Sequence, residues 1–121
     1  MHVVQALARL SVGGSELVST ELSEYLSERG HQVTVVGGSG PLSARVEAAG
    51  ATLLDWPVGR KRLSTLKLIG KFRRWLLKHK PDVVHVHSRL PAWVCWRAIG
   101  GIPITQRPAF VTSMHGQYTV S

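Results

Sequence analysis

Two glycines near the amino terminus are the residues of this sequence that point most directly to chemistry. Gly13 and Gly14 follow an apolar opening segment, and Ser15 begins a segment with helical spacing. A glycine turn that leads into a helix presents backbone N–H groups at the positive end of the helix dipole, which suits a phosphate group. We therefore expect Gly13, Gly14 and Ser15 to contact the anionic part of a substrate. The alternative is a tight turn that binds nothing.

Three histidines are the next candidates for chemistry. His85 and His87 are two apart in a predicted strand and so point to the same face, while His115 follows a later strand. Three imidazoles could hold a metal ion. However, the sequence places no acidic residue to orient them, so we expect no metal, and we expect a structural role for His85. For His87, a structural role and a substrate contact both stay open.

A nicotinamide or flavin cofactor is the competing ligand for the glycine turn. The turn does not have the pattern G-x-G-x-x-G, and the next strand ends at Val36, Gly37 and Gly38 without the acidic residue that would bind a ribose hydroxyl. We therefore expect no cofactor.

The elements that must position these residues alternate along the chain. Strands are predicted over residues 2–8, 32–37, 51–54, 82–87 and 110–114, and helices over 15–29, 41–50, 63–80 and 90–99. This alternation predicts an α/β fold, a Rossmann-like doubly wound parallel sheet of about five strands with helices on both faces. Such sheets bind ligands at the carboxyl ends of their strands. The glycine turn, His87 with Ser88, and His115 with Gly116 all fall at the carboxyl ends of predicted strands.

Apolar residues at helical spacing predict the buried faces. In the longest helix they are Leu66, Ile69, Phe72 and Leu76. In the first helix they are Val18, Leu22, Tyr25 and Leu26. Trp93 and Trp96 are expected to pack beside Cys95, with stacking on a ligand as the alternative for one of them.

Charge is distributed unevenly along the chain. The formal net charge is +8, of which residues 1–55 carry −3 and residues 56–121 carry +11. Four basic residues recur at helical spacing on the longest helix: Lys67, Lys71, Arg74 and Lys78. Such a stripe is usually a solvated face, but it can also dock on anionic lipids, and we expect it to form a membrane-contacting surface. No nucleic-acid-binding motif accompanies it, so no nucleic-acid partner is expected.

Length and composition indicate a single domain over residues 1–121, since 44% of its residues are hydrophobic. No apolar run reaches the ~18–20 residues that a membrane span needs, and the first residues resemble a buried strand more than a signal peptide. One cysteine, Cys95, excludes an internal disulfide and fits a reducing compartment. We expect a cytoplasmic protein with peripheral contact to the inner face of the membrane.

Four segments in a fixed order carry a resemblance to a known family. They run from Gly13 to Glu16, from Glu28 to Val35, from Pro81 to Ser88 and from Val111 to Gly116. Together they resemble the N-terminal, acceptor-side domain of GT-B glycosyltransferases of the family-4 type, over nearly the whole chain.

The resemblance implies two Rossmann-like domains that face each other across a cleft, the second of which binds a nucleotide-diphosphate sugar. It implies transfer with retention of configuration and no metal. The turn at Gly13 and Gly14 would approach the donor diphosphate. His87 and Ser88 would lie on the acceptor side. His115, beside Gly116, would be the catalytic residue, a hydrogen-bond donor to a sugar hydroxyl.

The function that this resemblance implies is one half of an enzyme. The enzyme would transfer a sugar to a glycolipid or polysaccharide acceptor, such as lipopolysaccharide, in cell-envelope synthesis. The donor-binding domain is absent from residues 1–121, so we expect it in cis or in trans and expect these residues alone to be inactive. The alternative is a non-catalytic domain that binds a sugar or lipid acceptor, or a subunit that pairs with a separate donor-domain chain. An exposed apolar edge at the last strand would favour a missing domain or partner.

Overall fold

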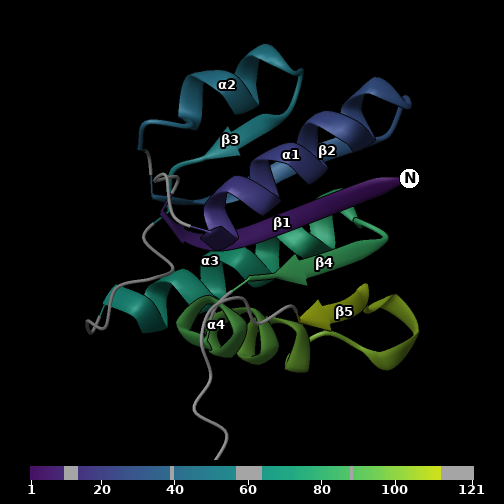
Figure 1. The fold of residues 1–121 in the computed structure, drawn as a ribbon. Coiled ribbons are helices and arrows are strands. Elements are labelled where there is room, and N and C mark those ends of the chain that lie inside the picture. Colours follow the sequence, from purple (N-terminus) through teal and green to yellow (C-terminus); the bar gives the residue numbers. More distant parts are fainter. Residues whose placement is uncertain (10–13, 39, 57–63, 88, 113–121) are drawn as a thin grey trace, which may run out of the picture.

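A parallel five-stranded sheet lies between two helical layers in the computed structural model, which describes residues 1–9, 14–38, 40–56, 64–87 and 89–112 (Figure 1). The strand order is β3-β2-β1-β4-β5. The strands are β1 (His2–Arg9), β2 (Gln32–Gly38), β3 (Thr52–Leu54), β4 (Val83–Val86) and β5 (Ala109–Thr112). The helices are α1 (Gly14–Glu28), α2 (Ser43–Ala48), α3 (Ser64–His79) and α4 (Arg89–Gly100). This confirms the predicted Rossmann-like doubly wound fold.

Local sequence explains where three of the helices end. Gly30 and Gly50 follow α1 and α2 with φ angles of 84° and 97°, a left-handed conformation that glycine adopts without steric cost. Pro81 follows α3 and prevents its continuation. The predicted bounds agree with the observed ones to within a few residues, although residues 113 and 114 of the fifth predicted strand lie outside the described part. A short 3₁₀ helix, Ile104–Gln106, has no counterpart in the prediction.

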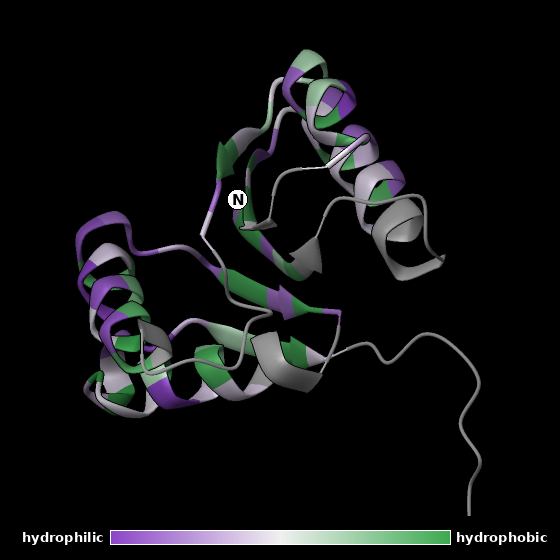
Figure 2. Cartoon of the chain, turned by 90° about the vertical axis from the view of Figure 1, so that its left-hand side faces the viewer, coloured by the Kyte–Doolittle hydropathy of each residue, from purple (hydrophilic) through white to green (hydrophobic). Residues whose placement is uncertain are grey.

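Each face of the sheet has its own core. Figure 2 shows the hydropathy of the residues along the strands and helices. Because successive strand residues alternate between faces, Val4 and Ala6 of β1 pack with α3 and α4, whereas Leu7 packs with the layer of α1 and α2. The first core centres on the fully buried Phe72 of α3, and the second on the fully buried Val46 of α2. A bidentate pair between Glu24 of α1 and Arg45 of α2 links the helices of the second layer.

Four of the residues predicted to be buried are exposed instead. Ile69, Phe72 and Leu76 of α3 face the core as expected, but Leu66 is 62% exposed, and Leu68 takes the buried place. The other three exposed side chains are Tyr25 (51%), Trp93 (45%) and Trp96 (59%). The predicted packing of both tryptophans is wrong: Cys95 between them is fully buried, so the tryptophans lie on the outer side of α4.

An aromatic cluster closes the amino-terminal edge of the first core. The His2 imidazole contacts the Trp75 ring edge-on, with ring centroids 5.7 Å apart, and its Nε2 lies 2.8 Å from the Thr34 hydroxyl. The His79 ring stacks on the Trp75 ring, with ring centroids 4.4 Å apart. The backbone N–H of His2 donates to the Asp82 carboxylate at 2.7 Å. These contacts join β1, β2 and α3 at the start of the sheet.

Candidate functional site

The centre of the sheet is where the chain reverses its direction of winding. β1 and β4 lie side by side, and the chain leaves β1 through α1 on one face but leaves β4 through α4 on the other (Figure 1). Open α/β sheets bind ligands outside the carboxyl ends of the two strands at such a switch point. We therefore define the candidate site as the carboxyl ends of β1 and β4 with the residues that follow them.

The glycine turn connects β1 to α1 at this edge. α1 begins at Gly14, so the helix N-terminus points toward the candidate site as the sequence predicted. Gly13 and the side chain of Ser15 lie outside the described part of the structure, so their contact with an anion stays a prediction. The observed strand-to-helix order at the switch point is the setting in which helix N-termini bind phosphate groups.

His87 is the predicted site residue that the structure describes most fully. It directly follows β4, and its backbone N–H donates to the Ala6 carbonyl of β1 at 3.0 Å. Its Nε2 lies 2.5 Å from Oε1 of Gln5, and its side chain is only 2% exposed. His87 is thus fixed by two contacts to β1, one through its backbone and one through its ring.

Gln5 is a residue of this site that the sequence prediction missed. It lies in β1 opposite His85 of β4 and is completely buried. The signal was visible, since a glutamine interrupts an otherwise apolar strand segment from Val3 to Leu7. A buried polar side chain in a central strand needs a partner, and the sequence alone does not say which.

His85 and His87 share a face, as predicted, and their ring centroids are 4.1 Å apart. His85 is partly exposed. Within the described ranges, no group of three or more histidine, cysteine, aspartate or glutamate side chains could hold a metal ion. His115, the third histidine of the alternative metal site, lies outside those ranges, as do Ser88 and Gly116.

The four basic residues of the predicted stripe, Lys67, Lys71, Arg74 and Lys78, are all exposed on α3. Lys71 places its Nζ 4.8 Å from the centroid of the Trp56 ring, a cation–π contact. α3 carries no acidic residue. The stripe is therefore an exposed set of basic residues on a helix without acidic residues. None of the helices in the described part of the chain has the length and apolar character required to cross a membrane.

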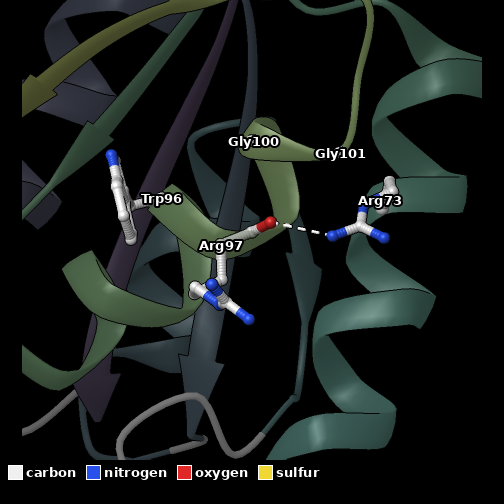
Figure 3. A pocket seen from close by; sticks show the side chains of 5 residues that line it. All are labelled: Arg73, Trp96, Arg97, Gly100 and Gly101. Carbon is white, nitrogen blue, oxygen red and sulfur yellow. Dashed lines mark hydrogen bonds between the residues drawn. The ribbon is translucent and has the colours of Figure 1, made fainter.

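A shallow pocket of about 330 Å³ lies between α3 and the end of α4 (Figure 3). Its lining consists of Arg73, Trp96, Arg97, Gly100 and Gly101. Arg73 spans the two helices, donating from Nε to the Ala98 carbonyl at 2.9 Å and from Nη2 to the Arg97 carbonyl at 2.8 Å. A cation at these carbonyls stabilises the negative end of α4. Arg73 is thus a structural clamp.

Comparison with known proteins decides the family. The sequence profile of Glycosyltransferase Family 4 matches residues 12–120, which is most of the chain. The chain belongs to glycosyltransferase family 4. This assignment confirms the predicted resemblance to the family-4 type.

Three known proteins are similar to this family 4 chain in sequence or in fold. The N-acetyl-alpha-D-glucosaminyl L-malate synthase of Bacillus anthracis is 29% identical over 111 residues, which are 88% of this chain and 29% of that protein. A glycosyltransferase from Rickettsia africae has the same fold, with a TM-score of 0.79 and 22% identity over 99% of this chain and 31% of its own. MurG of Acinetobacter baumannii gives a TM-score of 0.65 and 16% identity over 93% of this chain and 34% of its own. This family 4 chain thus spans about a third of the length of these relatives.

Proposed function

We propose that this family 4 chain is the acceptor-side domain of a retaining glycosyltransferase. The enzyme would transfer a sugar from a nucleotide-diphosphate sugar to a glycolipid or polysaccharide acceptor in cell-envelope synthesis. The observation that carries the proposal is the placement of the α1 N-terminus and His87 at one switch point in a chain that belongs to this family. The tendency of open α/β sheets to bind ligands at such a point supports the proposal.

Each site residue has a proposed role in the reaction. Gly13, Gly14 and Ser15 contact the donor diphosphate at the helix N-terminus. His87 and Ser88 contact the acceptor, while His115, next to Gly116, donates a hydrogen bond to a sugar hydroxyl near the reacting carbon. The acceptor hydroxyl attacks the anomeric carbon on the face from which the diphosphate leaves, so the configuration is retained. No step of this proposal uses a metal ion or a cofactor.

A donor-binding domain, in cis or in trans, completes the proposed enzyme. Two observations support this proposal. The chain spans 29% of its Bacillus relative, and the edge strand β5 exposes Ala109 and Val111. An uncovered apolar edge favours a missing domain or partner over an independent module. A non-catalytic acceptor-binding subunit that pairs with a separate donor-domain chain stays the second candidate.

Sugar transfer by the full natural polypeptide is the experiment that tests the proposal. We expect transfer from one member of a panel of nucleotide-diphosphate sugars, with the product keeping the donor's anomeric configuration by NMR. The acceptor panel includes L-malate, because the name of the Bacillus relative contains it. An inverted product would refute the retaining mechanism, and transfer by residues 1–121 alone would refute the need for a donor domain.

Substitution of His87 tests the location of the site. We expect His87→Ala to lower kcat/KM at least tenfold, because it removes a proposed acceptor contact. His31→Ala is the matched control, since His31 lies in the turn between α1 and β2, at the opposite end of the sheet. Equal activities of the two variants would remove His87 from the site.

A membrane surface is the proposed location of the enzyme, on the cytoplasmic side. The layer of α3 and α4 supports this proposal with three features. It carries the basic stripe, it has no acidic residue on either helix, and it exposes Trp93 and Trp96. Tryptophan rings and lysine side chains are the groups that favour the interface of an anionic bilayer. A solvated face without a partner is the alternative.

A further inference from the structure

The shallow pocket at the end of α4 brings two arginines and a tryptophan together (Figure 3). Arg73 lines the pocket from α3, while Trp96 and Arg97 line it from α4. Its volume of about 330 Å³ falls at the lower end of the range for small-molecule sites, about 300–1,000 Å³. Because α4 begins after β4 and leads back toward the start of β5, the pocket and the candidate site lie at opposite ends of this helix.

The positive charges of this pocket have no acidic counterpart in the surrounding layer. Neither α3 nor α4 contains an aspartate or a glutamate. The one acidic residue between residues 56 and 121 is Asp82, which does not line the pocket and accepts a hydrogen bond from the backbone N–H of His2. Like charges that share a concave surface without a counter-charge attract anions from solution.

Both arginines have hydrogen-bond donors available for a ligand. Arg73 donates from Nε to the Ala98 carbonyl and from Nη2 to the Arg97 carbonyl, and these two bonds fix the plane of its guanidinium group. Nη1 takes part in neither bond and carries two N–H groups of its own. The Arg97 side chain is exposed, and no hydrogen bond or ion pair joins it to another residue in the described part of the chain.

The end of α4 does not repel an anion, because arginines already neutralise its carbonyl groups. Next to the two carbonyls that Arg73 binds, Arg107 donates from Nε to the Ile102 carbonyl at 2.7 Å and from Nη2 to the Gly100 carbonyl at 3.2 Å. The end of a helix carries only about half a negative charge. The full positive charges of the arginines therefore dominate the electrostatics of the pocket.

We propose that this pocket binds a small, dissolved phosphate ester. The phosphate oxygens accept hydrogen bonds from Nη1 of Arg73 and from the Arg97 guanidinium group, and the Trp96 ring covers the organic part. A phosphate monoester carries about two negative charges near neutral pH, which matches two guanidinium groups better than the single charge of a carboxylate does. The inference does not rest on the proposed function, because the pocket contains none of the residues assigned to sugar transfer.

NMR of the tryptophan indole groups tests binding at this position in the full natural polypeptide. The probe is phenyl phosphate, which joins a phosphate group to a flat ring. We expect it to shift the Nε1–H signal of Trp96 and to leave that of Trp93 unchanged, since Trp93 is exposed on the same helix but does not line the pocket. Benzoate, with a single charge, and phenol, without charge at neutral pH, should bind at least tenfold more weakly.

Two matched arginine variants test the role of charge in the pocket. Arg97→Gln should raise the dissociation constant of phenyl phosphate about tenfold, because it removes a charge-assisted hydrogen bond. Arg74→Gln removes an equally exposed charge from α3, outside the pocket, and should leave the dissociation constant unchanged. Neither arginine side chain belongs to the core, so both variants should keep the melting temperature of the wild type.

Gly100→Leu tests the pocket without a change of charge. A Cβ atom at Gly100 would meet nothing within 4 Å, and the backbone there is not left-handed. The fold therefore accommodates a leucine, whose side chain occupies part of the pocket. We expect phenyl phosphate to bind this variant at least tenfold more weakly, while its melting temperature stays that of the wild type.

Four results would overturn the inference. An unshifted Trp96 signal would show that phenyl phosphate does not bind in the pocket, and so would unchanged binding to Gly100→Leu. Equal losses in Arg97→Gln and Arg74→Gln would indicate a general attraction of anions. A Trp96 signal that responds to vesicles with phosphatidic acid but not to phenyl phosphate would assign these arginines to a membrane surface. Because sugar transfer enters none of these measurements, failure of the proposed function would leave the inference intact.

Discussion

Cys95 illustrates how burial determines the reactivity of a single residue. Its thiol is fully buried in the core between α4 and the sheet, and burial raises its pKa far above the usual range. Because the thiolate is the reactive form, we expect no reaction of Cys95 with iodoacetamide in the native protein. Mass spectrometry should detect complete alkylation after unfolding in guanidinium chloride. Rapid alkylation under native conditions would contradict the burial of this side chain.

His2 makes the free energy of unfolding depend on pH. Burial lowers the pKa of its imidazole below 6.5, the nearby His79 adds to this effect, and Asp82 opposes it. The unfolded chain therefore binds a proton more readily than the folded one. Below about pH 6.5 the folded state should lose stability as the pH falls, until His2 is protonated in both states.

Urea unfolding at pH 7 and pH 5 measures this effect. From pH 7 to pH 5, the free energy of unfolding should fall further for the wild type than for the His2→Gln variant. The variant has no imidazole to titrate at this position. Thr34→Val serves as the control, because it removes the hydroxyl partner of His2 but leaves the titrating ring in place. Identical pH dependences for the wild type and His2→Gln would exclude His2 as the cause.

Single residues also show what the sequence could and could not predict. The shared face of His85 and His87 followed from the two-residue period of a strand, and the structure confirms it. The contact between His87 and Gln5 could not be predicted from this period. Gln5 is 82 residues away in sequence and approaches His87 only because β1 pairs with β4. Short-range periodicity predicts faces, whereas long-range contacts depend on which strands become neighbours.

At the scale of elements, the contact between α3 and α4 depends on a glycine. Arg73 of α3 lies directly against Gly101, so that a Cβ atom at this position would overlap its guanidinium group. Gly101→Ala should displace Arg73 from the carbonyl groups at the end of α4. We expect a loss of about 1 kcal/mol in the free energy of unfolding, because the flexible guanidinium group can move away but gives up its hydrogen bonds to these carbonyl groups.

The neighbouring glycine provides the matched control for this prediction. A Cβ atom at Gly100 would meet nothing within 4 Å, and neither glycine has a left-handed backbone. Gly100→Ala should therefore change stability by about 0.5 kcal/mol or less. Thermal and urea unfolding of both variants measure the difference. Equal effects of the two substitutions would show that contact with Arg73 does not limit the residue at 101.

Helix periodicity predicted the existence of α3 but misplaced one residue of its buried face. At 100° per residue, Leu68 and Leu76 lie within 40° of Phe72 on the helix circumference, whereas Leu66 lies 120° away (estimated from the ideal geometry, about 3.6 residues per turn). The prediction included Leu66 because it lies three residues before Ile69, and it left out Leu68. Trp93 and Trp96 were misplaced for a related reason, since size and apolarity suggested burial although α4 turns Val94, Cys95 and Ala98 toward the sheet.

At the scale of the whole molecule, the uneven charge along the sequence becomes a difference between two surfaces. The acidic first part forms α1 and α2 on one face of the sheet, and the basic second part forms α3 and α4 on the other. This separation follows from the fold, because the chain changes faces when it crosses from β3 to β4. The sequence therefore predicted the net charge of each part of the chain. The predicted sheet topology implied that the two parts lie on opposite faces of the sheet. The residues that follow β4 and β5 at the site, such as Ser88 and His115, lie outside the described part.

Binding to vesicles tests whether the basic layer is a membrane surface. We expect the protein to bind vesicles that contain an anionic lipid such as phosphatidylglycerol and not to bind neutral vesicles. Salt should weaken this binding. Substitution of Lys67, Lys71, Arg74 and Lys78 by glutamine should lower the affinity at least tenfold, because each basic residue near an anionic surface contributes about 1 kcal/mol. Co-sedimentation measures the bound fraction.

Two matched variants separate the position of a charge from its amount. Arg74 lies on the basic layer and Arg29 lies after α1 on the acidic one, and both side chains are exposed. Replacement of either by glutamine removes one positive charge, so a response to net charge alone would be the same for both. A membrane surface on α3 and α4 predicts weaker binding for Arg74→Gln and unchanged binding for Arg29→Gln. Equal losses, or equally tight and salt-sensitive binding to DNA, would show that the basic layer attracts polyanions in general and is not a specific membrane surface.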